Sequence, residues 1–191
     1  GEALADALEA LGLSDPVVLA LPRGGLPVAL PVAKRLGAPL DLILVRKIGA
    51  PRHEELAVGA VMDGPVPETV FNADVLSTLG LREADLAATI ADKLAEIEAR
   101  RALYLGDAPP VPVEGRTAIV VDDGIATGAT VRAALRGLAR RAPREVVLAV
   151  PVAPADSLAA LAPLVTRTVC LEQPEPFVAV GAHYMHFPQV E

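Results

Sequence analysis

Short apolar runs, separated by polar or glycine-containing turns, recur along most of the chain. Five of them lack alternation, at residues 16–21, 40–45, 117–121, 144–150 and 165–171. Such runs are typical of strands buried on both faces of a sheet. Helical spacing is found between them, at residues 2–11, 26–36, 129–141 and 155–161. The alternation predicts an α/β fold, with a central, mostly parallel sheet and helices on both faces.

The middle of the chain has a different pattern. Residues 46–55, "RKIGAPRHEE", are polar and contain glycine and proline, so we expect a loop there. Two short strands are predicted at residues 56–62 and 67–71, around a turn. Over residues 82–105 apolar side chains recur every three or four positions, which predicts one long amphipathic helix.

Composition narrows the possible partners. The net charge is -7 and no basic stripe is visible, which argues against a nucleic-acid surface. Prolines and charges interrupt the longest apolar stretch, so we expect no membrane span. The single cysteine, Cys170, excludes an internal disulfide and favours a reducing cytoplasm.

Residues 117–130, "TAIVVDDGIATGAT", carry the clearest chemistry. An apolar strand runs into Asp122 and Asp123, and a loop of small and hydroxyl residues then leads into a helix. Bare loop amides and a helix N-terminus form an anion site, whereas paired carboxylates suit sugar hydroxyls or magnesium. A phosphorylated sugar matches both halves. A plain strand–turn–helix would explain Asp123 or Thr127 alone, but not the whole ordered set.

This segment resembles the signature of type I phosphoribosyltransferases. Together with "LPRGGLPVA", "VRKIGAP…EELAVGAV" and "PFVAVGAHYMHFPQV", it resembles a bacterial group described as predicted phosphoribosyltransferases. The similarity covers nearly the whole chain. Because that group usually carries additional residues at both ends, a chain trimmed from a longer protein is expected.

The resemblance implies a magnesium-dependent enzyme that moves the phosphoribosyl group of 5-phosphoribosyl 1-diphosphate (PRPP) to a nitrogenous base and releases pyrophosphate. It implies a core at residues 1–171 that includes a mobile loop at about 47–55, and a C-terminal hood at residues 172–191. PRPP would be bound by Asp122, Asp123, Gly124, Ile125, Ala126, Thr127, Gly128, Ala129 and Thr130. The acid pair would bind the ribose hydroxyls directly, or through Mg²⁺ that enters with the ligand.

The pyrophosphate is assigned by the same resemblance to Arg23, Gly24, Gly25, Arg46 and Lys47. Arg23 and Lys47 join the acid pair as the expected catalytic residues. A strand-ending turn explains Gly24 and Gly25 equally well when they are taken alone, and solvated cations are the common fate of residues such as Arg46.

Three aromatic residues of the tail, Phe177, Tyr184 and Phe187, are candidates to stack on the base. Packing the tail onto the core explains them equally well. We further expect a cytoplasmic homodimer. Two alternatives stay open: a non-catalytic regulator that binds PRPP or a nucleotide on the same fold, and a hydrolase of such ligands.

Overall fold

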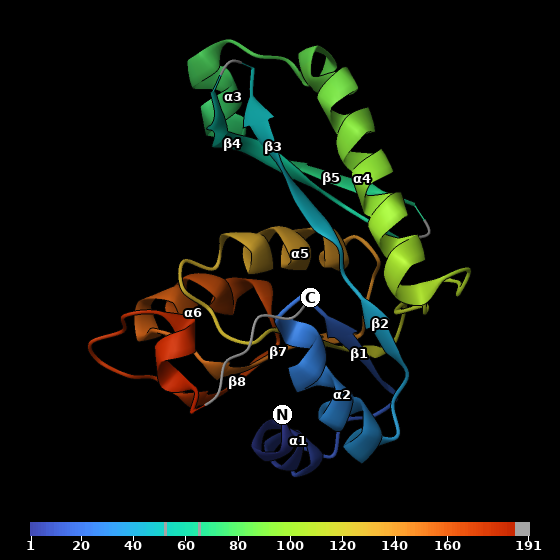
Figure 1. The fold of residues 1–191 in the computed structure, drawn as a ribbon, viewed down its shortest axis with the longest axis vertical. Helices are drawn as coiled ribbons and strands as arrows, with labels where there is room; N and C mark the ends of the chain where they lie inside the picture. Colours follow the sequence, from blue (N-terminus) through green and yellow to red (C-terminus); the bar gives the residue numbers. More distant parts are fainter. Residues whose placement is uncertain (52, 65, 186–191) are drawn as a thin grey trace. The chain divides into compact units, whose positions relative to one another are not determined.

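The computed structural model describes residues 1–51, 53–64 and 66–185, and the chain divides into two compact units. One unit comprises Gly1–Leu42 and Val111–Glu191, and the other comprises Ile43–Pro110. In Figure 1 the second unit is coloured from cyan to light green.

The first unit is built on a five-stranded parallel sheet with the order β2-β1-β6-β7-β8. Its strands are β1 (Pro16–Ala20), β2 (Leu40–Leu42), β6 (Thr117–Val121), β7 (Glu145–Val152) and β8 (Arg167–Glu172). Its helices are α1 (Glu2–Glu9), α2 (Gly25–Leu36), α5 (Ala129–Ala139), α6 (Ala155–Leu161) and the 3₁₀ turns η2 (Ala162–Leu164) and η3 (Val180–His183). Helices α1 and α2 lie on one face of the sheet, and α5 and α6 lie on the other (Figure 1). The predicted parallel sheet with helices on both faces is confirmed.

Burial explains the apolar runs. All five residues of β6 are buried, and so are four of the five residues of β1. A strand covered by helices on both faces has no solvent-facing side, so alternation is absent.

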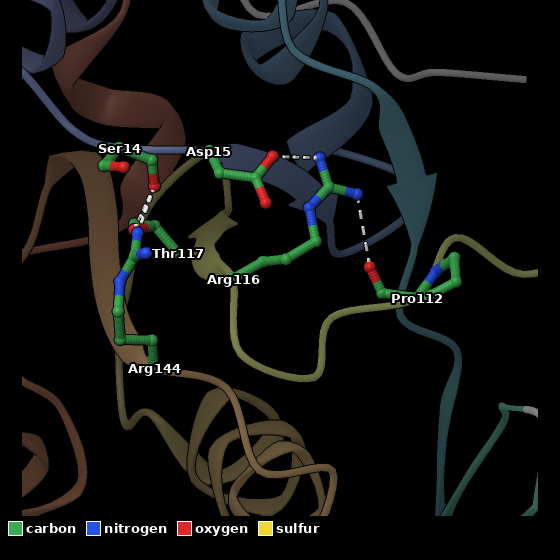
Figure 2. A network of polar contacts seen from close by, with 6 residues as sticks. All are labelled: Ser14, Asp15, Pro112, Arg116, Thr117 and Arg144. Atoms are coloured by element: carbon green, nitrogen blue, oxygen red, sulfur yellow. Dashed lines mark hydrogen bonds and ion pairs between the residues drawn. The ribbon is translucent and has the colours of Figure 1, made fainter.

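A polar network closes the amino edge of this sheet (Figure 2). The Thr117 hydroxyl, which is fully buried, donates to the carbonyl of Ser14 at 2.7 Å and accepts from Arg144 at 2.9 Å. Arg116 donates to Asp15 at 2.8 Å. These contacts hold the starts of β1 and β6 together.

The second unit is a three-stranded antiparallel sheet with the order β3-β4-β5, accompanied by helices. Its elements are β3 (Val45–Ala50), β4 (His53–Met62), β5 (Glu68–Phe71), α3 (Ala73–Leu79), the 3₁₀ turn η1 (Glu83–Leu86) and α4 (Ala87–Leu105). Asp63, 4% exposed, accepts the N–H of Leu44 at 2.8 Å and pairs with Arg101 at 2.7 Å.

Two predictions for this part of the chain are wrong. Residues 46–50 and 53–55 do not form the predicted loop, because they belong to β3 and β4, which pair as antiparallel strands with a register shift at Gly49. Ile48 and Ala50 are buried while Lys47 is exposed, so an alternating strand pattern was masked by glycine and proline. The strand predicted at residues 40–45 ends at Leu42, since Leu44 donates to Asp63 instead of to the parallel sheet.

Candidate active site

The carboxyl ends of β1 and β6 lie side by side where the chain connections diverge. Leu21 follows β1, and its N–H donates to the carbonyl of Val121 at 2.9 Å. Strand β1 leads through α2 to β2 on one side, whereas β6 leads through α5 to β7 on the other. Open parallel sheets bind ligands at such a topological switch point. The predicted acid pair and the predicted Arg23–Gly25 turn both lie here.

Two glycines of that turn pack directly against the two acids. A Cβ on Gly24 would lie 1.9 Å from Asp123 Oδ2. A Cβ on Gly25 would lie 2.6 Å from the Val121 carbonyl oxygen and 3.4 Å from Asp122 Oδ1. The closest of these distances leave no room for a side chain, so this approach of the two segments requires glycine. Arg23, the preceding residue, is exposed, and its peptide bond with Pro22 is cis.

The acid pair is poorly compensated. Asp122 Oδ1 accepts the N–H of Asp123 at 2.9 Å. Burial raises the pKa of the Asp122 carboxyl well above its usual range, and the neighbouring charge of Asp123 adds to the effect. Burial also raises the pKa of Asp123. Within the described part of the chain, neither carboxylate has an ion-pair partner. Hydrogen-bond donors or a cation supplied by a ligand would stabilise the charged form of such a pair.

The loop that follows, residues 124–130, leads into the start of α5. Gly128 adopts φ 72° and caps the helix, a left-handed conformation that favours glycine. Two contacts fix the loop: the N–H of Ile125 donates to Val152 at 3.0 Å, and the hydroxyl of Ser157 donates to the Ala126 carbonyl at 2.6 Å. Ala126, Thr127, Ala129 and Thr130 are exposed. The 11-residue α5 therefore presents its N-terminus and two hydroxyls next to the acid pair.

The C-terminal segment also reaches the acid pair. The Tyr184 hydroxyl donates to the main-chain carbonyl of Asp123. Burial raises the pKa of Tyr184 to about 12, and the charges of Asp123 and Asp122 act in the same direction, so its hydroxyl is a proton donor at neutral pH. Phe177 stacks on His183, with ring centroids 5.3 Å apart. Phe187 lies outside the described residues.

Sequence reasoning missed Ser157 and the contact made by Tyr184. Ser157 carries no signal, since a lone serine in the first turn of a short helix is common. Tyr184 was singled out for its ring, and the structure shows that its hydroxyl is engaged.

Arg46 and Lys47 lie on β3 in the Ile43–Pro110 unit. Arg46 pairs with Glu96 at 3.4 Å, and Lys47 is exposed. Their assignment to pyrophosphate stays a prediction.

Two further observations concern metals and membranes. Within residues 1–51, 53–64 and 66–185, no group of three or more His, Cys, Asp or Glu side chains is placed to hold a metal ion. Asp122 and Asp123 are adjacent hard oxygen ligands, which Mg²⁺ accepts when a phosphate ligand supplies the rest of its shell.

None of the described helices is both long and apolar enough to cross a bilayer.

Comparison with known proteins agrees with this geometry. The family model described as "Phosphoribosyl transferase domain" matches residues 1–184. Two Mycobacterium tuberculosis proteins, from strains CDC 1551 and H37Rv and each named "Putative phosphoribosyl transferase", are 43% identical over 189 residues, which is 99% of this chain. The chain spans 42% of the length of these relatives. The crystal structure of TT1426 from Thermus thermophilus is 42% identical, with a TM-score of 0.85 over 100% of this chain and 89% of that one.

Proposed function

We propose that this chain, which belongs to the phosphoribosyl transferase domain family, binds PRPP at the switch point and transfers its phosphoribosyl group to a nitrogenous base. The observation that carries the proposal is the arrangement of Asp122 and Asp123 between the Gly24–Gly25 turn and the anion-binding loop 124–130. The names of the Mycobacterium relatives support it.

Each part of PRPP matches one part of this arrangement. The ribose hydroxyls donate hydrogen bonds, and the acid pair offers acceptors that lack cationic partners in the described chain. The 5-phosphate is an anion, and it matches the amides of residues 126–130 at the start of α5. The pyrophosphate would be bound by Arg23 and the close-packed glycines.

The reaction breaks the bond between ribose C1 and the pyrophosphate oxygen, which leaves with the electron pair. A base nitrogen donates its electron pair to C1 and gives up a proton. Because the transition state has oxocarbenium character, catalysis rests on positioning and on charge stabilisation. The acid pair would orient the ribose, and Arg23 would stabilise charge on the departing pyrophosphate.

Magnesium would be held by Asp122 and Asp123 together with oxygens of PRPP, and it would neutralise charge on the pyrophosphate. The raised carboxyl pKa values fit a pair that is completed by a cation. We therefore expect tight PRPP binding to require Mg²⁺.

The test combines binding and turnover. PRPP binding is measured by calorimetry with Mg²⁺, and pyrophosphate release is followed with a panel of bases. The double variant Asp122→Asn/Asp123→Asn should lose PRPP binding while remaining folded. Its matched control is Asp92→Asn/Asp107→Asn, which changes two exposed aspartates in the other unit and should bind normally.

The outcomes separate the functions that remain. Base-dependent pyrophosphate release supports the transferase, and base-independent release would indicate a hydrolase. PRPP binding without any turnover would indicate a regulator. Unchanged PRPP affinity in the acid-pair variant would remove the ribose assignment.

A further inference from the structure

Tyr184 connects the C-terminal segment to the candidate ribose site. Its hydroxyl donates to the carbonyl oxygen of Asp123, 61 residues earlier in the chain. That carbonyl belongs to the peptide between Asp123 and Gly124, so the contact falls on the backbone of the acid pair itself.

The N–H of the same peptide acts on the Asp123 carboxylate. Burial raises the pKa of the Asp123 carboxyl, and the N–H of this peptide, on Gly124, acts in the opposite direction. The N–H and C=O of a trans peptide point in opposite directions. Holding the carbonyl on one side therefore holds the Gly124 N–H towards the carboxylate on the other. Glycine adds a need for this restraint, because its backbone rotates with little steric hindrance.

The C-terminal segment is well placed to supply that restraint. Val180 of η3 packs over Gly124, where an added Cβ would come within 2.7 Å of Val180 Cγ1. Phe177 and His183 stack on each other within the same segment. Tyr184 thus extends from a segment that already contacts the acid loop.

We propose that Tyr184 is a positioning residue for ribose binding: it fixes the Asp123–Gly124 peptide, and through it the orientation of the Asp123 carboxylate. This inference rests on the proposed PRPP site. It also assigns Tyr184 a function other than stacking on the base, which was the sequence-based prediction. The C-terminal segment is then part of the sugar site, and PRPP affinity depends on it even in the absence of a base.

The decisive variant is Tyr184→Phe, which keeps the ring and removes the hydroxyl. Calorimetry with PRPP and Mg²⁺, without base, should show about fivefold weaker binding, as expected for the loss of one net hydrogen bond. In turnover the KM for PRPP should rise by a similar factor, while the KM for the base stays the same. Tyr104→Phe, at the other tyrosine of the chain, is the matched control and should bind PRPP like the wild type.

If Tyr184 only anchored the tail, Tyr184→Phe would lower the melting temperature and leave PRPP affinity unchanged. Wild-type PRPP affinity in Tyr184→Phe would therefore overturn the proposal. A base-stacking residue would behave differently again: Tyr184→Phe would act normally, and Tyr184→Leu would raise the KM for the base alone.

Amide hydrogen exchange of Gly124 gives a readout that needs no ligand. Exchange should accelerate in Tyr184→Phe and stay at the wild-type rate in Tyr104→Phe. If the wild-type protein does not bind PRPP, the proposed function fails, and the exchange rate still decides whether Tyr184 fixes this peptide. An unchanged Gly124 rate would refute the positioning role.

Discussion

Carboxylates at the amino edge of the parallel sheet, where the strands begin, form ion pairs, whereas the acid pair at the carboxyl edge, where the strands end, does not do so among the described residues. At the amino edge, Asp15 pairs with Arg116 at 2.8 Å, and Glu145 pairs with Arg167 at 3.5 Å (Figure 2 shows the first pair). At the carboxyl edge, Asp122 and Asp123 lie next to each other and have no ion pair within the described chain. The charges named at the amino edge are neutralised within the described part of the protein, and those of the acid pair at the carboxyl edge are not.

Whether a carboxylate has an ion-pair partner, rather than its residue type, indicates whether it serves folding or function. A carboxylate that is paired inside the protein contributes to folding. A buried carboxylate pair with raised pKa values lowers the free energy of unfolding. Such a pair is typical of a functional site. The contrast predicts that changes at the amino edge alter stability, whereas changes at the carboxyl edge alter ligand binding.

The largest expected effect is that of Gly25→Ala at the carboxyl edge. The new methyl would meet the Val121 carbonyl at 2.6 Å, and this backbone atom cannot move away without disturbing β6. We expect a loss of about 3 kcal/mol in the free energy of unfolding, the upper range for overpacking, together with loss of PRPP binding. Urea unfolding and calorimetry measure both. Gly12→Ala, where no atom lies within 4 Å but φ is +60°, should cost about 1 kcal/mol of strain and leave binding intact. Normal PRPP binding in Gly25→Ala would show that this close contact does not matter for the site.

Thr117→Val tests the amino edge. It removes a fully buried hydroxyl that serves the Ser14 carbonyl and Arg144, and it keeps the β-branched shape. The carbonyl and the guanidinium then lose a partner, so the free energy of unfolding should fall by about 2 kcal/mol. PRPP affinity should stay the same, because the site lies at the opposite edge. A loss of affinity larger than the loss of stability would contradict the division between the edges.

Asp122→Asn should raise the free energy of unfolding, whereas Thr117→Val should lower it. The folded pKa of Asp122 is raised, so the native state binds the proton more tightly than the unfolded state. The free energy of unfolding therefore falls as pH rises from the unfolded pKa through the folded pKa. Asparagine removes this cost and should stabilise the protein by about 1 kcal/mol at pH 7. The gain should vanish at pH below about 3, where both states of the wild type are protonated. Urea unfolding at both pH values checks the sign, and a destabilised variant at pH 7 would refute it.

The parallel sheet was predictable because burial on both faces produces continuous apolar strands, as in residues 117–121. The acid pair was predictable because it directly follows such a strand. Pairing of the Gly24–Gly25 turn with these acids depends on β1 and β6 being neighbours, which strand spacing alone does not determine. Only the resemblance placed both segments in one site.

The second unit was less predictable, since its strands follow a different rule. In β3 buried Ile48 and Ala50 alternate with exposed Lys47 and half-buried Gly49, and Gly49 shifts the register. Gly and Pro within ten residues outweighed this short alternation and led to the loop prediction. Helix α3 was not predicted, although α6 has the same length of seven residues and was.

The smallest expected effect is that of Asp15→Asn, which breaks the Arg116 pair at the amino edge. The aspartate side chain is 57% exposed, whereas that of Arg116 is 23% exposed. An exposed pair gains little because water already solvates both charges, so the loss should be about 0.5 kcal/mol at low salt. Asparagine Oδ1 can still accept the guanidinium hydrogen bond, so the change isolates the charge. The difference from the wild type in urea unfolding should shrink as ionic strength increases from about 0.01 M to 1 M, since screening shortens the range of the interaction. A loss above about 2 kcal/mol that is insensitive to salt would mean that the amino edge holds a tightly coupled network, in which this pair cannot be separated from Thr117 and Arg144.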